Sequence, residues 1–273
     1  MVLNTALLLG VLTGILLAVG WVIAGPGGMT VALAFSVIFN LAAYYYSDKL
    51  ALRMYKAKPT DDPELNAIVS RIAAKAKVPK PRVYIIPTRV PNAFATGRNS
   101  RNAVIAVTEG LRNLSADEME AVISHEIGHI RNRDILVSSL AATIAGAISY
   151  IAQMSYWSMF LGGDRKGEGS MLGLVFIMIF APLAAMLVRL AISRSREYKA
   201  DKTGILLTQK PENLISALRK ISAGAKEHPL RSGSPSTAHM WIVNPFGSDW
   251  FTGLFTTHPP IEKRIERLER LLA

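Results

Sequence analysis

The stretch ADEMEAVISHEIGHIRNRDILV, residues 116–137, decides the fold, because it places a metal-binding pattern at the start of an uncharged run. His125 and His129 stand four residues apart, so on a helix both rings lie on one face, about one turn apart. Six residues after His129, at Ile135, begins an uncharged run that continues to position 163. The sequence therefore joins a pattern typical of hydrolytic chemistry to a candidate membrane span.

The whole chain has the composition of a membrane protein. Half of its 273 residues are hydrophobic and the mean hydropathy is +0.27, which is too apolar for an ordinary soluble domain. A helix that crosses the bilayer core needs about 20 apolar residues. Buried core helices of a soluble protein are the alternative, but several long uncharged runs in one chain favour membrane spans. These runs are 4–24, 29–46, 135–163 and 169–188.

The first two runs predict a hairpin of two spans. No Lys or Arg precedes the first run, so the basic region of a cleaved signal peptide is missing. The link Gly-Pro-Gly-Gly at 25–28 leads directly into the second run. The same reasoning predicts a second hairpin from the last two runs.

The distribution of basic residues predicts the orientation of these spans. Of the 31 Lys and Arg residues, 15 lie between the second and third runs, 14 lie from Arg189 onward, and 2 lie between the third and fourth runs. Because short cytoplasmic flanks collect positive charge, we expect the catalytic segments and both termini to face the cytoplasm. The tips at 25–28 and 164–168 then face outward.

The formal net charge of +11 follows mainly from this orientation and from attraction to lipid headgroups. The chain carries no basic patch interleaved with aromatic residues, so we expect no nucleic-acid partner. It contains no cysteine, which excludes disulfides and thiolate chemistry within this sequence.

The predicted fold class is a mainly α membrane protein with four transmembrane helices and a cytoplasmic α+β catalytic domain assembled from two chain segments. The expected parts are a transmembrane hairpin at 1–46 (spans about 4–24 and 29–46), a cytoplasmic segment at 47–134, a second hairpin at 135–192 (spans about 135–160 and 170–192), and a cytoplasmic segment at 193–273.

Local signals predict elements in the cytoplasmic segments. Asp62 followed by Pro63 predicts the start of a helix that ends near position 75. The stretches PRVYIIP and NAVIAV, at 81–87 and 102–107, are rich in β-branched residues and predict strands of a small sheet. Ser115 and Glu118 form a capping-box pattern that opens the helix carrying His125.

The late part of the chain predicts two helical regions around a loop. The chain turns polar and helical from 193 to about 222, and PPIEKRIERLERLLA predicts a final amphipathic helix. Between them, 224–257 predicts a surface loop pinned by its aromatic residues. A flap over an active site or an interfacial anchor are the alternatives. The apolar stripe of the final helix consists of Ile261, Ile265, Leu268 and Leu272.

The HEIGH pattern predicts a zinc site. Imidazole nitrogens at this spacing can reach one Zn²⁺ at about 2.0–2.1 Å. Glu126, beside the first histidine, is placed to accept a proton from the water that zinc activates and to pass it to the leaving amine. The alternatives are histidines that pair with acidic residues, or a purely structural metal site.

Topology predicts the third ligand. A HExxHxxGxxH site would need Gly at position 132 and His at 135, but these positions hold Asn132 and Ile135. After two crossings the chain returns to the same side, and its first acidic residue there is Glu197, which we expect to complete the site. Asp201, four residues later on the same helical face, is placed to orient a ligand histidine. The alternative for this pair is a solvated acidic face among basic residues.

His258, in THPP ahead of the last helix, has two interpretations. A lone histidine is usually structural, whereas a functional one would donate to the oxyanion of the tetrahedral intermediate or help to position the site. His228 and His239 lie in the Gly/Ser/Pro-rich segment, and the sequence assigns them no role.

Four motifs in this order, NAFATG, HEIGH, SRSREYKAD and THPPIEKRI, give the whole chain a close resemblance to the HtpX family, membrane-embedded zinc endopeptidases related to the CAAX-prenyl proteases. The resemblance implies a minigluzincin-like core in which His125, His129 and Glu197 bind one Zn²⁺ per chain. It implies that Glu126 is the catalytic residue and that Asp201 occupies the family's second acidic position.

The resemblance also implies a substrate surface and a cellular role. Substrate would lie along an edge strand by β-augmentation, which uses main-chain bonds and makes little demand on sequence. The implied role is quality control of misfolded or damaged membrane proteins, cut at the cytoplasmic face of the cell membrane. The residues of this strand are Asn92, Ala93, Phe94, Ala95, Thr96 and Gly97.

Two other functions fit parts of the sequence. A catalytically silent membrane scaffold could use zinc to join its soluble segments, but such a site needs no base at Glu126. A zinc transporter would carry ligands inside its spans, and the four uncharged runs contain no His, Asp or Glu. The expected partners are protein substrates and the lipid bilayer, and the sequence makes no prediction of oligomeric state.

Overall fold

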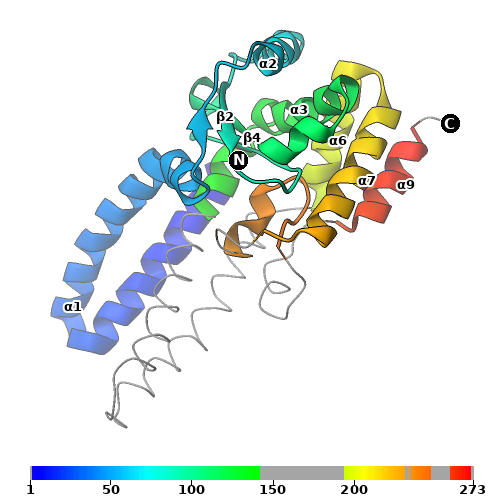
Figure 1. Ribbon diagram of the computed structural model, residues 1–273. Coiled ribbons are helices and arrows are strands. Elements are labelled where there is room, and N and C mark those ends of the chain that lie inside the picture. The colour runs from blue at the N-terminus through cyan, green and yellow to red at the C-terminus, as the bar shows by residue number, and fades with distance from the viewer. Residues whose placement is uncertain (1, 142–193, 231–232, 234, 247–258, 272–273) are drawn as a thin grey trace, which may run out of the picture.

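The computed structural model describes residues 2–141, 194–230, 233, 235–246 and 259–271. In Figure 1 a long helical hairpin, α1, extends from one side of a body that contains the sheet and the remaining helices. The predicted third and fourth spans lie almost wholly outside the described residues.

Helix α1 (Val2–Met54) reverses direction where the Gly-Pro-Gly-Gly link was expected to turn. Ala24 and Gly25 leave the helical conformation, with φ of −146° and 57°. Glycine reaches positive φ without the clash that a Cβ causes. The part from Ala24 to Met54 is long and apolar enough to cross a membrane. Its large apolar side chains are mostly exposed, including Val31, Phe35 and Ile38, as suits a helix surrounded by lipid.

A four-stranded mixed sheet forms the centre of the body, in the order β1-β2-β4-β3. Strands β2 (Arg82–Ile86) and β4 (Val104–Thr108) are parallel, and both match predicted strands. The short β1 (Lys58–Pro59) pairs antiparallel with β2. Strand β3 (Ala93–Thr96) pairs antiparallel with β4, so it forms one edge of the sheet, as the resemblance implied.

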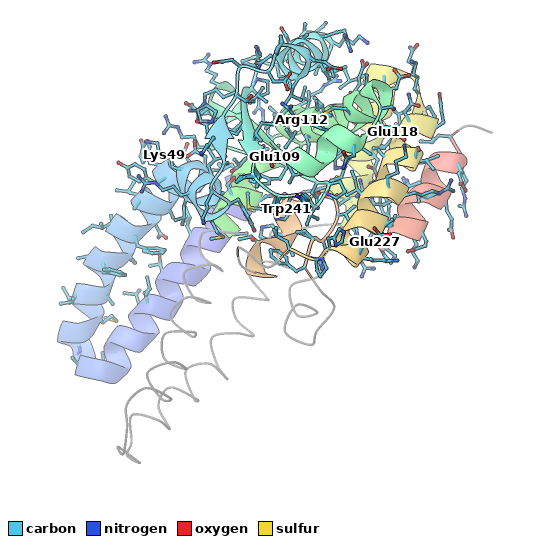
Figure 2. The ribbon with its side chains drawn as sticks, in the orientation of Figure 1. Lys49, Glu109, Arg112, Glu118, Glu227 and Trp241 are labelled. Carbon is cyan, nitrogen blue, oxygen red and sulfur yellow. The ribbon has the colours of Figure 1, made fainter. Side chains whose placement is uncertain are left out.

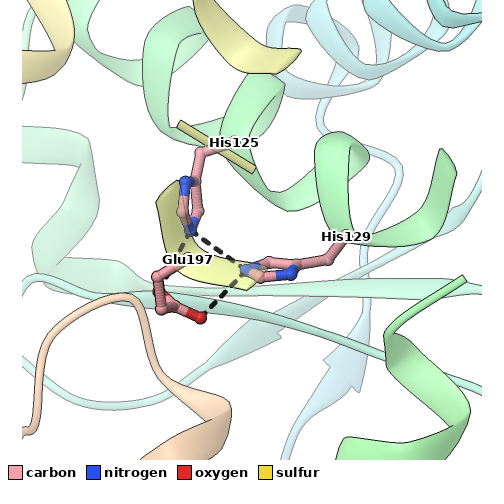
Figure 3. Close-up of side chains that lie close together, drawn as sticks. All are labelled: His125, His129 and Glu197. Carbon is pink, nitrogen blue, oxygen red and sulfur yellow. Dashed lines mark hydrogen bonds and ion pairs between the residues drawn. The ribbon is translucent and has the colours of Figure 1, made fainter. Parts of the chain in front are cut away.

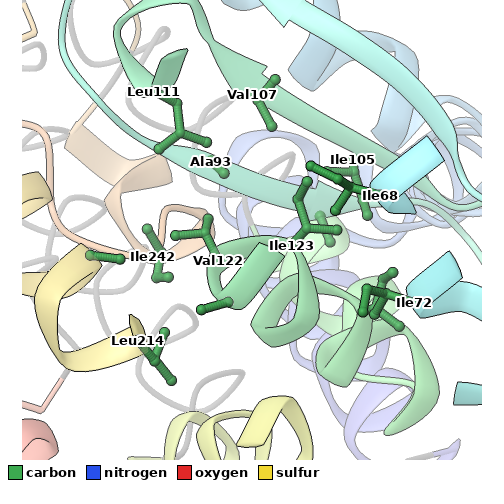
Figure 4. Close-up of a cluster of buried hydrophobic side chains, with 14 of the residues drawn as sticks. Ile68, Ile72, Ala93, Ile105, Val107, Leu111, Val122, Ile123, Leu214 and Ile242 are labelled. Atoms are coloured by element: carbon green, nitrogen blue, oxygen red, sulfur yellow. The ribbon is translucent and has the colours of Figure 1, made fainter. Parts of the chain in front are cut away.

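Two helices with the predicted caps pack with this sheet. In α2 (Pro63–Ala76) the Asp62 carboxylate accepts bonds from two main-chain amides of the first turn. In α3 (Ala116–Arg131) both halves of the Ser115–Glu118 capping box form. Side chains from α2, α3 and the sheet make one buried cluster, shown in Figure 4. Within the described residues, three short 3₁₀ helices form, η1 (Ser100–Asn102), η2 (Glu109–Asn113) and η3 (Pro235–Met240).

Glu118 also fixes the start of α3 to α7 (Pro211–Glu227), and Figure 2 labels it there. Its carboxylate accepts bonds from Ser216 Oγ at 2.6 Å and Lys220 Nζ at 2.9 Å. Burial alone would raise the pKa of Glu118, yet the bonds led by Lys220 lower it to about 2. The side chain therefore stays ionised and keeps α3 aligned over α7.

The late region that was predicted to be helical, from 193 to about 222, is helical and extends to Glu227. It forms two helices, α6 (Arg194–Thr208) and α7, because Gln209 turns with a φ of 58° and Pro211 starts a new helix. The final helix, α9 (Ile261–Glu269), buries Ile265 and Leu268 as expected, and it also buries Arg264 completely.

The central packing contact of the body is the crossing of α3 and α6. A Cβ added to Gly128 in α3 would lie 3.0 Å from the Ala200 carbonyl oxygen, and one added to Gly204 in α6 would lie 3.1 Å from the His125 amide nitrogen. The two main chains thus touch through their glycines. This close approach explains a glycine inside the HEIGH helix, which costs about 1 kcal/mol of helix propensity relative to alanine.

We expect Gly128→Ala to destabilise the protein by about 1 kcal/mol. Overpacking against a main chain costs about 1–3 kcal/mol, while the better helix propensity of alanine returns about 1 kcal/mol. Thermal unfolding in detergent should show the loss. Gly14→Ala in α1, where nothing lies within 4 Å of the added Cβ, is the matched control. Equal or higher stability of Gly128→Ala would contradict the close crossing.

Candidate metal centre

The crossing of α3 and α6 brings the predicted ligands together (Figure 3). His125 and His129 come from α3 and Glu197 from the first turn of α6. One donor atom from each lies within 4.8 Å of the others. His125 and Glu197 are buried, and His129 is partly buried. His129 and Glu197 are 68 positions apart in the chain, yet they belong to one cluster.

The distances between these donor atoms suit a tetrahedral ion. The Nε2 atoms of His125 and His129 are 3.2 Å apart, and Glu197 Oε1 is 3.4 Å from His129 Nε2. Glu197 Oε2 is 3.8 Å from His125 Nε2. Tetrahedral ligands placed at zinc distances are separated from one another by about 3.3 Å. Two imidazole nitrogens and a carboxylate oxygen are also a donor set that zinc prefers, so the residues present fit this ion.

Asp201 lies beside His125, the position expected of a residue that orients a ligand histidine. Its Oδ1 lies 2.9 Å from His125 Nδ1. A carboxylate can only accept, so Nδ1 carries the proton and Nε2 presents its lone pair to the other donors. The alternative of a solvated acidic face is wrong, because Glu197 and Asp201 are only 4% and 3% exposed.

Arg264 holds Asp201 in place, and sequence reasoning missed it. Its Nε and Nη2 atoms donate to the two oxygens of Asp201 at 3.0 and 2.6 Å. Its Nη1 lies 3.7 Å from Glu197 Oε2. Burial alone would raise the pKa of Asp201, but the Arg264 charge, the strongest interaction, lowers it to about 2. Asp201 therefore remains a carboxylate that can accept from His125.

Asp134 lies beside the other histidine of the cluster, His129, as Asp201 lies beside His125. Its Oδ2 lies 3.4 Å from His129 Nδ1. The turn after α3 makes this contact possible, since Arg133 adopts a φ of 62° and the Asp134 amide donates to the His129 carbonyl at 2.9 Å. The HEIGH helix therefore ends at Arg131, and residues 135–141 form a separate helix.

Glu126 lies in the same buried space, 1% exposed. Burial, assisted by the negative charge of Glu197, raises its pKa to about 7, although His129 and a hydrogen bond with the Ala95 backbone lower it. A carboxyl group that titrates near neutrality can both accept and return a proton. The pocket beside it also contains His239.

The charges around the two histidines favour a cation. Burial alone would lower the pKa of His129, but the Glu197 carboxylate leads the charges that raise it to about 9. Burial lowers the pKa of His125. The negative potential that attracts a proton to His129 also attracts a divalent ion. Binding of zinc would release that proton.

The predicted substrate strand lies beside this centre, but its outer edge is covered. The Ile242 amide donates to the Ala93 carbonyl at 3.1 Å. Asn92 Nδ2 donates to the Val243 carbonyl at 2.7 Å. At the other end of the strand the Gly97 amide donates to Ser139 Oγ at 3.3 Å. The protein's own chain therefore occupies part of the outer edge of β3. His258 lies outside the described residues.

The missed residues differ in the signal that they leave in the sequence. Asp134 follows His129 by five residues, and an acidic residue so close to a ligand could have been noticed as its orienting partner. Arg264 leaves a signal of another kind, because three positions after Ile261 and four before Leu268 it falls on the apolar stripe of the final helix. His239 reaches the pocket through a segment without helical or strand periodicity.

A helix bearing HExxH, met by a second helix that supplies Glu197, defines a zinc metalloprotease. Comparison with known proteins agrees: residues 59–272 match peptidase family M48, and the chain belongs to this family. A protease HtpX homolog of Pyrococcus abyssi is 50% identical over 98% of this chain and 95% of its own length. One of Syntrophobacter fumaroxidans is 49% identical over 98% of both chains.

The fold has a relative among solved structures. The crystal structure of S. mikatae Ste24p aligns with 98% of this chain at a TM-score of 0.52 and 17% identity. This chain spans 64% of that protein. The likeness supports a Ste24-like arrangement of helices around a small sheet.

We expect Asp201→Asn to weaken zinc binding about 10- to 100-fold, the usual cost of losing the partner of a ligand histidine. The amide can present its NH₂ group to His125 and leaves the buried Arg264 charge without its counter-charge. Competition with a chelating dye measures the affinity. Asp117→Asn, on the exposed face of α3, should bind zinc like the parent. Parental affinity in Asp201→Asn would show that Asp201 does not position the ligand.

Proposed function

We propose that this protein is an integral membrane zinc endopeptidase that cuts misfolded or damaged membrane proteins at the cytoplasmic face. The observation that carries the proposal is the buried cluster in which three zinc-type donors surround the space next to Glu126. In this proposal His125, His129 and Glu197 hold one Zn²⁺. When bound, zinc polarises the scissile carbonyl and activates a water molecule.

The protein's own residues supply the proton transfers. The Glu126 carboxylate accepts the proton of the attacking water, and its pKa of about 7 allows it to give that proton to the leaving amine. Asp201 and Asp134 hold the histidine rings, so Nε2 of each ring stays directed at the centre. No covalent intermediate with the protein is required.

The membrane part of the proposal rests on α1 and on the uncharged runs. The length and the exposed apolar surface of the helix from Ala24 to Met54 support its assignment as a membrane span. With four spans, the two catalytic segments would lie on one side and form a minigluzincin-like domain. Unfolded tails and loops of membrane proteins would reach a site beside the bilayer. His258 would then act near the reacting carbonyl as an oxyanion donor.

A Glu126→Gln variant tests the mechanism. We expect it to bind zinc at one equivalent and to lose about 10²- to 10⁴-fold in kcat on an unfolded model protein, because the amide cannot accept the proton. Glu120→Gln, on the same helix and paired with Arg71 at 2.8 Å, should retain parental activity. If Glu126→Gln with bound zinc cleaves as fast as the parent, Glu126 is not the base.

Cysteine labelling tests the topology, and the chain offers a clean background because it has no cysteine. Gly27→Cys and Lys166→Cys should react with a membrane-impermeant thiol reagent added to intact cells. Lys77→Cys, just after α2, should react only after the membrane is opened. Labelling of position 77 in intact cells would reverse the proposed orientation.

A further inference from the structure

The segment Pro235–Phe246, called the strap below, lies across the candidate site. In Figure 1 it is the orange stretch between α1, the sheet and α7. Its residues Thr237 to Val243 are all buried. The space left between Glu126, His129 and the strap holds about 20 Å³. That is room for about one water molecule. A peptide therefore cannot reach Glu126 while the strap stays in this position.

The strap occupies two hydrogen-bonding groups that a substrate strand would need. Ile242 donates its amide to the Ala93 carbonyl at 3.1 Å, and Val243 accepts from Asn92 Nδ2 at 2.7 Å. An extended peptide that adds to the β3 edge would use this carbonyl and this side-chain amide. The strap and a substrate thus compete for the same groups. Arg264 Nη1 also donates to the Ile242 carbonyl, at 2.8 Å.

One aromatic side chain anchors the strap. Trp241 is fully buried, and Figure 2 shows it inside the body. Its ring lies 4.8 Å from that of Tyr55 and 4.9 Å from that of Phe94, with edge-to-face geometry. Trp241 Nε1 donates to the Tyr55 hydroxyl at 3.3 Å, and this hydroxyl also bonds Thr237 Oγ1. Tyr55 directly follows the last residue of α1.

The strap belongs to a loop whose two ends meet. The Leu230 amide, at the start of this loop, donates to the Pro245 carbonyl at 2.7 Å. A loop tied at its ends can leave as a unit, since the bonds at its base do not depend on the contacts at its tip. Gly233, with a φ of 98°, lies within this loop and adopts a conformation that favours glycine.

We propose that the strap is an autoinhibitory cover: it occupies the place of the substrate along β3, Tyr55 at the end of the membrane hairpin latches it, and cleavage requires its release. This proposal rests on the proposed function, because it describes the regulation of the same site. The Tyr55 hydroxyl stabilises only the closed state, in which Trp241 Nε1 and Thr237 are removed from water. Losing this hydroxyl should therefore favour opening.

Tyr55→Phe tests the latch in the full-length, zinc-loaded protein. We expect kcat/KM for a short fluorogenic peptide to rise about three- to tenfold, the population change that corresponds to the net contribution of one hydrogen bond. Hydrogen exchange of the amides at 240–243 should accelerate in the same variant. Tyr84→Phe, which removes a hydroxyl from β2, should change neither quantity. Unchanged exchange and unchanged kcat/KM in Tyr55→Phe would overturn the latch.

A cysteine pair tests the cover in the opposite direction. Ala93→Cys with Ile242→Cys links the strap to β3 at their main-chain bond, where both side chains share one buried cluster. We expect oxidation to reduce peptide cleavage at least tenfold and a reductant to restore it. The two single variants should not respond to the oxidant. An oxidised, linked double variant that cleaves as fast as its reduced form would overturn the proposal.

These measurements separate the failure of the proposal from that of the proposed function. If the parent and Tyr55→Phe cleave at equal rates and the linked form stays active, the strap is structural and the protease assignment of the site stands. If zinc binds but neither parent nor reduced double variant cleaves any peptide or unfolded protein, the proposed function and the cover fall together.

Discussion

The contact of α3 with α6 at Gly128 and Gly204 is the constraint on which the site depends. Neither helix holds a complete donor set, and the pieces meet only because the two main chains approach to van der Waals distance. A side chain in this contact would move Glu197 away from the histidines, and zinc geometry tolerates displacements of only a few tenths of an ångström. Each glycine costs about 1 kcal/mol of helix propensity. The protein accepts this cost where it fixes the distance between ligands.

Much of the framework could be predicted, because it depends on local signals. The capping box at Ser115, the Asp62 cap and the β-branched strands each act within a few residues, and all three formed as expected. The cluster of His125, His129 and Glu197 was also predictable, since two constraints of different origin agreed. The helical period joined the histidines, and the expected return of the chain to one side of the membrane pointed to the first acidic residue there.

The remainder depends on tertiary context, which a single sequence does not reveal. The place of Arg264 on the apolar stripe of α9 indicates burial, but only the structure shows that Asp201 faces it. The break at Gln209 depends on a left-handed residue whose type gives no warning. The covering of β3 could not be read from its sequence either. The Ala93 carbonyl can accept a hydrogen bond from any extended chain at this edge, and the packing of Trp241 together with the Arg264 bond to Ile242 places the protein's own chain there.

Arg264 has a consequence for biosynthesis. Domains generally fold as the chain leaves the ribosome, beginning with the N-terminal parts. The histidines of α3 are made early, Glu197 and Asp201 follow, and α9 is made after every other described element that contributes to the site. Until Arg264 arrives, Asp201 lacks the counter-charge that allows it to stay ionised when buried, and Ile242 lacks a donor for its carbonyl. The order of synthesis thus delays both the zinc centre and its cover to the same late moment, and a nascent protease cannot become active before the segment that restrains it is present.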